Sequence, residues 1–443
     1  MRLLDTTSLE FHVGEHATFR QEGYATLSHR WVWQEITLDQ FGSHVEELRS
    51  SARPLSPQLE KIRATCATAR SKGIKWIWID SCCIDKRDMV ELTESINSMY
   101  KWYRDSVLCI VYLYDVKKSD AVSITNPHIF NRIDRDEPSE WFSRGWTLQE
   151  LLAPREMEFY DKEWTYMGTK KDMKTSLGKV TGINEIYLSG QVHFRKACIA
   201  MKMSWMARRK TTRREDVAYS MVGLFGITMT PVYGEGHGAF ARLQEILMSW
   251  SSMDESLFAW KMPALDSGNQ YTYSSDPWQS GEWGLLAPSP EWFADCGAIM
   301  TFEHKPPRRG LFTMSPNGIE APVGRSAQTP EVECLQCLAC FGFMYGVVFG
   351  ILPCIYYRRL LKKVSNEEFA FKLQCFEPDA AGNCYELEPV EIYLRPIARV
   401  EDFPPSDAPI ISLKRVRCTE FGRASKPIGA KTGLVPQPSV TDL

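Results

Sequence analysis

The stretch from Lys75 to Asp88 constrains the fold more than any other part of the chain. Apolar side chains fall on both alternations around its start, with Ile74, Trp76 and Trp78 on one side and Ile77 and Ile79 on the other. Successive side chains of a strand point to opposite faces, so both faces of this strand must be covered. The pattern predicts an interior strand of a parallel sheet over Ile74–Asp80.

The apolar run ends abruptly in a polar cluster that begins with Asp80 and continues to Asp85. Open α/β sheets place their ligand sites just beyond the carboxyl ends of their strands, so this cluster stands where a site is expected. The alternative is that Asp80 and Asp85 only cap and turn the chain. Both interpretations stay open from this stretch alone.

Expected helices and strands alternate around this stretch. Ser56-Pro57 begins one helix, which ends at Gly73, and Asp88 begins another, with Glu91 as its capping-box partner. Further strands are expected at Tyr24–Ser28, Val107–Tyr114 and Met157–Tyr160. The alternation predicts an α/β fold with a doubly wound, mainly parallel sheet over residues 20–160.

A chain of 443 residues is long enough for two or three domains. The α/β domain is expected to cover residues 1–165, and a helical segment is expected over 166–260. Short apolar segments between stretches rich in Pro, Gly and Ser predict a β-rich C-terminal domain at 261–424. The polar residues 425–443 predict a disordered tail.

Charge and cysteine usage exclude some classes of protein. The net charge is −3, and the basic run at residues 208–214 is short and followed by acids, so no nucleic-acid partner is expected. Thirteen cysteines without a signal peptide indicate free thiols in a reducing compartment, which predicts a cytoplasmic protein. Cys334, Cys337 and Cys340 have the spacing that begins a ferredoxin-type motif, but the fourth ligand is not in place, so no metal is expected.

Leu338–Tyr357 is an uncharged stretch long enough to cross a bilayer. It also contains Gly342, Gly346, Gly350 and Pro353, which suit short strands and turns. A membrane span and buried strands are therefore both open, and membrane association is the less favoured interpretation.

Two nucleophile–histidine pairs are visible in the sequence. Ser28 and His29 are neighbours on an expected strand, so their side chains should point to opposite faces and cannot form a dyad. Cys82 or Cys83 with His29 would suit a cysteine hydrolase, but no residue is evident that would orient the histidine.

Three segments together resemble the fungal heterokaryon incompatibility (HET) domain: Tyr24–Trp31, Trp78–Asp85 and Arg144–Glu150. The residues Trp205 to Trp260 also resemble the segment that follows HET domains. Two positions depart from the family pattern, because Val32 stands where the family usually has Gly and Lys86 where it usually has Gln. The departures put the turn after Trp31 and the polar role of residue 86 in doubt.

The resemblance implies a role in fungal non-self recognition (heterokaryon or vegetative incompatibility), with the domain triggering programmed cell death. The HET domain is also similar to TIR domains, and Trp146–Leu151 resembles the TIR segment whose Glu is catalytic in NAD glycohydrolases. This likeness implies Glu150 as the catalytic residue. The expected substrate-binding residues are Ser28, Arg30, Asp80, Arg144 and Trp146, with Arg30 or Arg144 on a phosphate.

Two classes of function stay open. One is an effector that consumes NAD as a substrate and needs no cofactor; a carboxylate at Glu150 would stabilise the oxocarbenium-like state, and burial near Trp146 would raise its pKa. The other is a non-enzymatic signalling module that acts by homotypic assembly. The expected partners are homotypic or heterotypic incompatibility proteins. An enzyme requires Ser28, Asp80 and Glu150 to converge in one cleft, whereas assembly requires a flat exposed face.

Overall fold

The computed structural model describes residues 1–32, 34–50, 54–250, 254–263, 283–301, 312–315, 318–321, 369–378, 387–396, 411–416 and 433–435. The chain divides into two compact units. The first contains residues 1–196 and 208–239, and the second contains residues 197–207 and 240–443. Residues 208–239 therefore belong to the first unit, although residues 197–207 before them belong to the second. The domain boundaries at 165 and 260 stay predictions.

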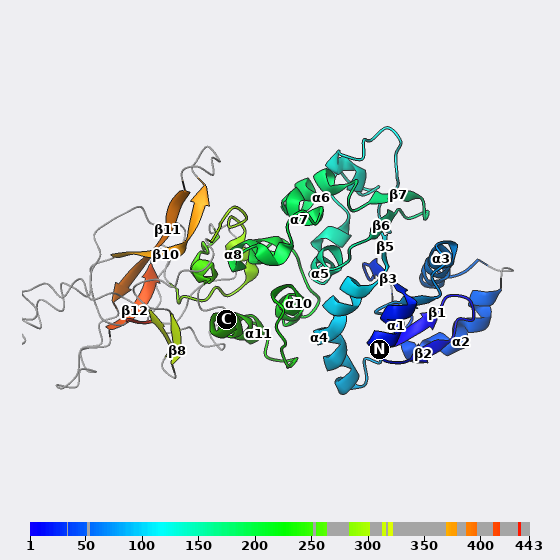
Figure 1. The fold of residues 1–443 in the computed structure, drawn as a ribbon, viewed down its shortest axis with the longest axis horizontal. Helices are drawn as coiled ribbons and strands as arrows, with labels where there is room; N and C mark the ends of the chain where they lie inside the picture. The colour runs from blue at the N-terminus through cyan, green and yellow to red at the C-terminus, as the bar shows by residue number, and fades with distance from the viewer. Residues whose placement is uncertain are drawn as a thin grey trace, which may run out of the picture. The chain divides into compact units, whose positions relative to one another are not determined.

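A seven-stranded sheet organises the first unit (Figure 1). Its strands are β1 (Arg2–Asp5), β2 (Phe11–Val13), β3 (Tyr24–His29), β4 (Trp76–Trp78), β5 (Leu108–Tyr112), β6 (Met157–Tyr160) and β7 (Tyr166–Thr169). Their order is β2-β1-β4-β3-β5-β6-β7, and the four strands from β4 to β6 are parallel. β1, β2 and β7 pair antiparallel at the two edges. The α/β class and the interior position of β4 are confirmed, although β4 is shorter than predicted. The sheet is mixed, because three of its six strand pairs are antiparallel, and the doubly wound, mainly parallel arrangement stays a prediction.

Helices cover both faces of this sheet. On one face, the Tyr24 hydroxyl donates to the carbonyl of Trp102 in α4 (Met89–Asp105) at 2.6 Å, and the rings of Trp78 and Trp102 lie 5.5 Å apart. On the other face, His29 contacts Lys61 of α3 (Pro57–Ser71) at 2.9 Å. Right-handed crossovers produce this arrangement whenever the chain moves from one strand to the next in opposite directions, as it does from β3 to β4 and from β4 to β5. The likeness to TIR domains stays a prediction.

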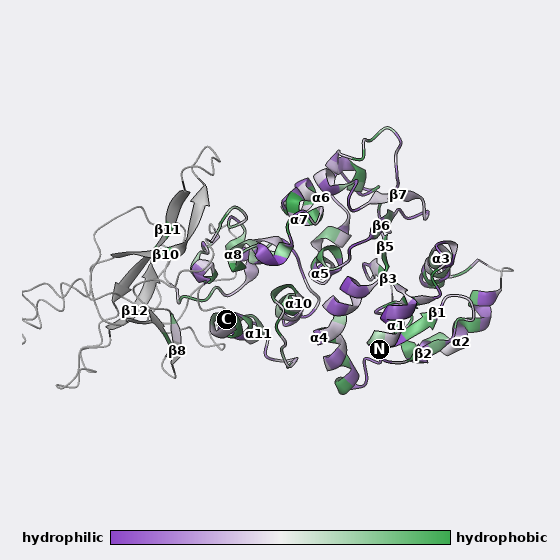
Figure 2. Cartoon of the chain, viewed as in Figure 1, coloured by the Kyte–Doolittle hydropathy of each residue, from purple (hydrophilic) through white to green (hydrophobic). Residues whose placement is uncertain are grey.

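The other helices of the first unit are short. They are α1 (His16–Glu22), α2 (Leu38–Arg49), α5 (Thr147–Leu152), α6 (Lys174–Thr181), α7 (Glu185–Leu188), α9 (Asp216–Tyr219), α10 (Val222–Phe225) and the 3-10 helices η1 (Pro127–Phe130), η2 (Glu140–Ser143) and η3 (Phe194–Lys196). Figure 2 shows hydrophilic and hydrophobic residues on the same helix in α2 and α4, as expected of helices that bury one face.

The two long helices begin where the sequence predicts, but one cap differs. Ser56 caps α3 by accepting a hydrogen bond from the Leu59 amide, and Asp88 caps α4 by accepting from the amides of Val90 and Glu91. The Glu91 side chain does not complete the predicted capping box. Its carboxylate instead accepts from the Asp85 amide at 2.9 Å, and it also pairs with Arg2. Glu91 thus joins the β4–α4 loop to β1.

α10 packs against α4 without room for a side chain at Gly223. A Cβ atom at this position would lie 2.2 Å from the Cβ of Tyr100. We therefore expect Gly223→Ala to reduce the free energy of unfolding by about 1–3 kcal/mol or more, the cost of overpacking. Denaturant unfolding measures this. Gly42→Ala in α2 is the matched control, because no atom lies within 4 Å of the added Cβ. It should stabilise slightly, and an equal response of both variants would contradict the tight contact.

The second unit contains the helices α8 (Ile199–Met206) and α11 (Gly238–Trp250), of which α11 begins in the first unit, and the 3-10 helices η4 (Glu255–Phe258) and η5 (Pro290–Phe293). A six-stranded sheet has the order β10-β11-β12-β13-β9-β8. Its strands are β8 (Thr313–Ser315), β9 (Gly318–Ala321), β10 (Phe369–Pro378), β11 (Leu387–Pro396), β12 (Ile411–Val416) and β13 (Gly433–Val435). β13 lies within the segment 425–443 that the sequence predicts to be disordered.

The segment Leu338–Tyr357 and the cysteines at 334, 337 and 340 lie outside the described residues. Within the described ranges, no helix combines the length and the apolar character that crossing a bilayer requires.

Candidate functional site

The carboxyl end of β3 presents two different sites on its two faces. The Ser28 hydroxyl donates to Glu150 at 2.6 Å on the face that α4 covers. The next residue, His29, contacts Asp80 and Lys61 instead, each at 2.9 Å. The geometry agrees with the prediction that Ser28 and His29 point to opposite faces and form no dyad.

The carboxyl group of Glu150 is buried. Its side chain lies in the first turn of α5 and is 2% exposed, and Ser28 is fully buried beside it. The Trp141 indole donates to the Ser28 hydroxyl at 2.9 Å, which directs the hydroxyl hydrogen toward the Glu150 Oε2 atom. Burial raises the pKa of Glu150 to about 7, against the positive charge of Arg144, and the negative charge of Asp80 acts in the same direction as burial. A carboxyl group with this pKa changes its charge near neutral pH.

Arg209 and Lys210 hold the start of α5 in place. The Arg209 guanidinium donates to the Thr147 hydroxyl at 2.9 Å and to the Arg144 carbonyl at 3.0 Å. The Gly145 amide donates to the Lys210 carbonyl at 2.8 Å, and the Lys210 amide returns a bond to Ser143. Arg209 is buried, and burial lowers its pKa to about 10. The basic run, for which the sequence predicts a solvated or salt-bridged face, therefore contributes a buried arginine to the support of α5.

Asp80 lies at the centre of the second cluster. Its carboxylate accepts from His29 Nε2 at 2.9 Å and from the Trp31 indole at 3.1 and 3.2 Å, and Arg144 Nη2 lies 3.7 Å away. Burial opposes ionisation, but the hydrogen bond from His29 and the charges of Arg144 and Lys86 lower the pKa of Asp80 well below its usual range. Asp80 is therefore a carboxylate at every physiological pH.

A buried ion pair orients His29. Lys61 Nζ donates to both carboxylate oxygens of Glu35, at 2.6 and 2.7 Å, and contacts His29 Nδ1 at 2.9 Å. All three side chains are at most 5% exposed. An ammonium group only donates, so Nδ1 must accept and the proton resides on Nε2, facing Asp80. Burial, assisted by the Lys61 charge, lowers the pKa of His29. His29 is thus neutral with both nitrogens occupied, which leaves it no capacity to act as a base.

The thiols next to Asp80 have no catalytic environment. Cys82 and Cys83 are buried and unpaired. A hydrogen bond with Cys83 and burial raise the pKa of the Cys82 thiol well above its usual value. Neither ring nitrogen of His29 is directed at a thiol, so the geometry gives no support to a cysteine hydrolase. The described part of the chain also contains no group of three or more His, Cys, Asp or Glu side chains placed to hold a metal ion.

The structure brings the predicted site residues together in pairs. Ser28 contacts Glu150, and Arg144 lies near Asp80. The other two predicted residues bond elsewhere: Arg30 Nε donates to Glu140 at 2.7 Å, and the Trp146 side chain hydrogen-bonds Asp216.

Sequence reasoning missed the residues Trp31, Glu35, Lys61, Trp141 and Arg209 as parts of the site. Trp31, Arg209 and Trp141 lie in or next to the segments that resemble the HET domain and its following segment. This position was the sequence signal that could have identified them. Lys61 and Glu35 lie outside these segments.

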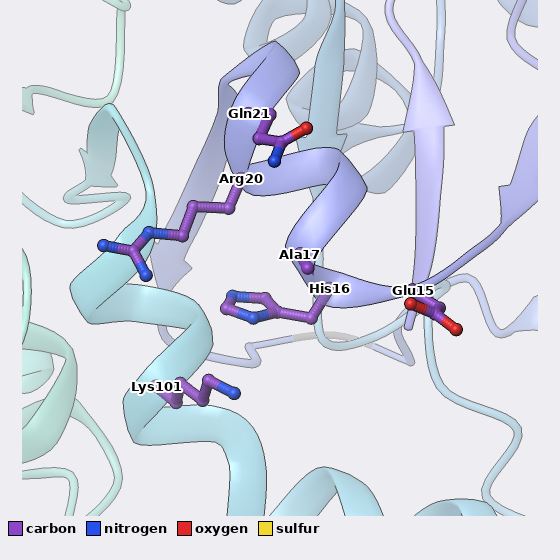
Figure 3. A pocket seen from close by; sticks show the side chains of 6 residues that line it. All are labelled: Glu15, His16, Ala17, Arg20, Gln21 and Lys101. Atoms are coloured by element: carbon purple, nitrogen blue, oxygen red, sulfur yellow. The ribbon is translucent and has the colours of Figure 1, made fainter.

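A pocket of about 510 Å³ lies in another part of the first unit. Its lining consists of Glu15, His16, Ala17, Arg20, Gln21 and Lys101. Figure 3 shows the side chains of His16 and Arg20 extending from α1 toward α4, which carries Lys101. None of the predicted site residues lines this pocket, so it is separate from the Glu150 and Asp80 clusters.

Comparison with known proteins identifies a family for part of the chain. Residues 24–129 match the family model described as "Heterokaryon incompatibility protein (HET)". The chain is also 37% identical over 223 residues to "Vegetative incompatibility protein HET-E-1" of Podospora anserina, which covers 50% of this chain and 16% of that protein. No solved structure matches. Residues 24–129 of the α/β unit are therefore similar to the HET domain. Ser28 and Asp80 lie inside the matched residues, and Glu150 lies beyond them.

Proposed function

We propose that this HET-domain chain is an effector of heterokaryon (vegetative) incompatibility that triggers programmed cell death. The family match and the vegetative incompatibility protein of Podospora anserina support this role. The chain spans less than a fifth of that relative, so the proposal concerns the HET domain and not the other parts of the relative. Its proposed partners are other incompatibility proteins, and its proposed location is the cytoplasm.

We further propose that the domain hydrolyses NAD with Glu150 as the central carboxylate. The observation that carries this proposal is the buried carboxyl group of Glu150, held by Ser28 and with its pKa raised to about 7. Perturbed carboxyl groups are typical of catalytic sites. As the bond between ribose and nicotinamide breaks, its electron pair leaves with neutral nicotinamide. Water then adds to the ribose carbon and loses a proton, and a carboxylate stabilises the cationic transition state.

The other site residues have supporting roles in this proposal. Ser28 positions the Glu150 carboxylate, while Asp80 and Arg144 bind the substrate. Arg30 and Trp146 were also expected to bind substrate, and they would first have to leave Glu140 and Asp216. Since Glu150 is 2% exposed, substrate must enter through a local opening of the site.

The same burial favours a second candidate, a non-enzymatic module that acts by assembly. Ser28 and Glu150 are as inaccessible as core residues, and a structural carboxyl group would be buried in the same way. Incubating the purified protein with NAD and measuring released nicotinamide separates the two candidates. Release that requires Glu150 supports the enzyme, whereas no release at any protein concentration supports assembly without catalysis.

The pH dependence of nicotinamide release is a direct consequence of the Glu150 environment. Only the ionised carboxylate stabilises the cationic transition state, and the pKa of Glu150 is about 7. The rate should therefore rise by about tenfold per pH unit up to roughly pH 7 and level off above it. A rate profile from roughly pH 5 to pH 8, with circular dichroism at each pH to verify folding, measures this. A flat profile or a rate that falls with pH would contradict the role of Glu150.

A further inference from the structure

Three cationic side chains surround the Asp80 cluster, and they differ in how well they are paired. Lys61 has both oxygens of Glu35. Arg144 donates to the His29 carbonyl at 2.6 Å and lies 3.7 Å from Asp80. Lys86 has no hydrogen-bonded carboxylate or carbonyl partner. Its Nζ atom is buried and makes no hydrogen bond within the described residues.

The ring of Trp31 gives the Lys86 ammonium its closest favourable contact. Nζ lies 3.7 Å from the ring centroid, and the Arg144 guanidinium lies 5.6 Å from the same ring. A cation–π contact replaces only part of the hydration that a buried ammonium group loses. A buried polar group without a partner indicates an absent ligand, ion or water. Burial also lowers the pKa of Lys86, which is the expected response of a cation without an adjacent anion.

The charges in the cluster do not balance. Two carboxylates, Glu35 and Asp80, face three cations, Lys61, Arg144 and Lys86. His29 is neutral, so it does not alter the sum. Glu150, whose carboxyl group interacts with the charge of Arg144, is neutral as long as it keeps its proton, below about pH 7. One positive charge then remains, and it lies on Lys86 and Arg144 around Trp31. A single anion would balance the cluster.

We propose that Lys86 and Arg144 bind a phosphoryl group of the substrate, the diphosphate of a dinucleotide, with the Trp31 ring as the outer wall of the site. A guanidinium group binds a phosphate through two parallel hydrogen bonds, and an ammonium group adds a point charge. The side chain of Trp31 is 37% exposed, and displacing its ring would uncover both cations together. The identity of the ligand rests on the proposed function, whereas the phosphoryl site itself rests on Lys86, Arg144 and Trp31.

Calorimetric titration at low ionic strength, with inorganic pyrophosphate and separately with NAD, tests the site. Lys86→Gln should weaken the binding of both ligands by about tenfold or more, and Lys86→Arg should bind nearly as the parent does. Lys75→Gln is the matched control, because Lys75 also lies over a tryptophan ring, at 4.3 Å from Trp76, but is 61% exposed. It should bind as the parent does. Lys86→Met replaces Lys86→Gln in the comparison if the latter does not fold.

The outcomes separate this site from NAD hydrolysis. If pyrophosphate binding depends on Lys86 and no nicotinamide is released, the phosphoryl site is supported and NAD hydrolysis is excluded. Nicotinamide release with an unchanged KM in Lys86→Gln supports the hydrolase and overturns the site. The site is also overturned if the parent protein binds neither pyrophosphate nor NAD. The same holds if all the variants bind pyrophosphate as tightly as the parent does. Tight binding of pyrophosphate but not NAD would support the phosphoryl site and assign it to a smaller phosphate ligand.

Discussion

Glu150→Gln should reduce nicotinamide release from NAD by about a hundredfold or more, the effect of losing a main electrostatic group. Glutamine retains the size of glutamate and can still accept the hydrogen bond from Ser28. What it removes is the negative charge opposite the cationic transition state. The release of nicotinamide at roughly pH 8, where the parent carboxyl group is ionised, measures the effect.

The same substitution should make the protein more stable above neutral pH. The pKa of Glu150 rises on folding from its ordinary value of 4.5 to about 7, mainly because of burial. Between these values the unfolded chain has lost the proton while the folded protein keeps it, so rising pH lowers the free energy of unfolding of the parent. Above about pH 7 the loss amounts to roughly 3 kcal/mol. Glu150→Gln avoids this loss, and the two proteins should differ little below about pH 4.5.

Urea unfolding at acidic and alkaline pH measures this difference. Glu163→Gln is the matched control, because Glu163 is 51% exposed in a surface pair with Lys117 and should change neither stability nor activity. Cell killing on overexpression should disappear with the enzymatic activity of Glu150→Gln. A stable Glu150→Gln variant that kills as well as the parent would exclude the enzymatic mechanism and favour assembly. A Glu150→Gln variant less stable than the parent at alkaline pH would contradict the raised pKa.

Lys61→Met should lower the free energy of unfolding by about 3–5 kcal/mol, the usual cost of breaking a buried ion pair. Lys61 and Glu35 expose at most 3% of their side chains. Without Lys61, the Glu35 carboxylate remains buried and loses the donor that binds both its oxygens. His29 Nδ1 loses its donor as well. The loss of stability should become smaller as the pH falls, because a protonated His29 can pair with Glu35, 3.9 Å away.

Two further proteins make the ion-pair test specific. The double variant Lys61→Met with Glu35→Leu removes both charges and should recover most of the lost stability, because a well-packed apolar pair often replaces a buried ion pair without cost. Lys72→Met is the surface control, since Lys72 is 41% exposed in its pair with Glu158 and should lose no more than about 1 kcal/mol. Chemical denaturation measures all of them. If Lys61→Met lowers the free energy of unfolding by no more than Lys72→Met does, Lys61 and Glu35 do not act as a buried ion pair.

The central sheet could be predicted because its signals are local. Two-sided apolar alternation marks β4 as interior, and the Ser56 and Asp88 caps mark the starts of α3 and α4. Strand alternation alone separates Ser28 from His29. These features depend only on neighbouring residues, so the sequence is sufficient to predict them.

The second cluster could not be predicted because its contacts join distant positions. Lys61 lies on the buried side of α3 between apolar residues, where a sequence pattern gives no partner, and Glu35 lies 26 positions earlier in a loop. The sequence also gave no basis for choosing between Arg30 and Arg144 near a site. The choice follows from Glu140, which engages Arg30 and leaves Arg144 near Asp80. Lys86 appeared as a departure from a family pattern, and only its burial without a hydrogen-bond partner gives it a role.

The support of α5 by Arg209 and Lys210 limits where the chain can be truncated. A polypeptide ending at residue 165 would retain Ser28, Asp80 and Glu150 in its sequence. It would lack Arg209, which lies 62 positions beyond the threonine that it binds, and it would leave the Gly145 amide without its acceptor. Burial raises the pKa of Glu150, and the bonds from Arg209 and Lys210 help to hold the start of α5, which carries Glu150. The short motif around Glu150 therefore acquires all of its supporting bonds only in a chain that extends to residue 210, well beyond the matched residues 24–129.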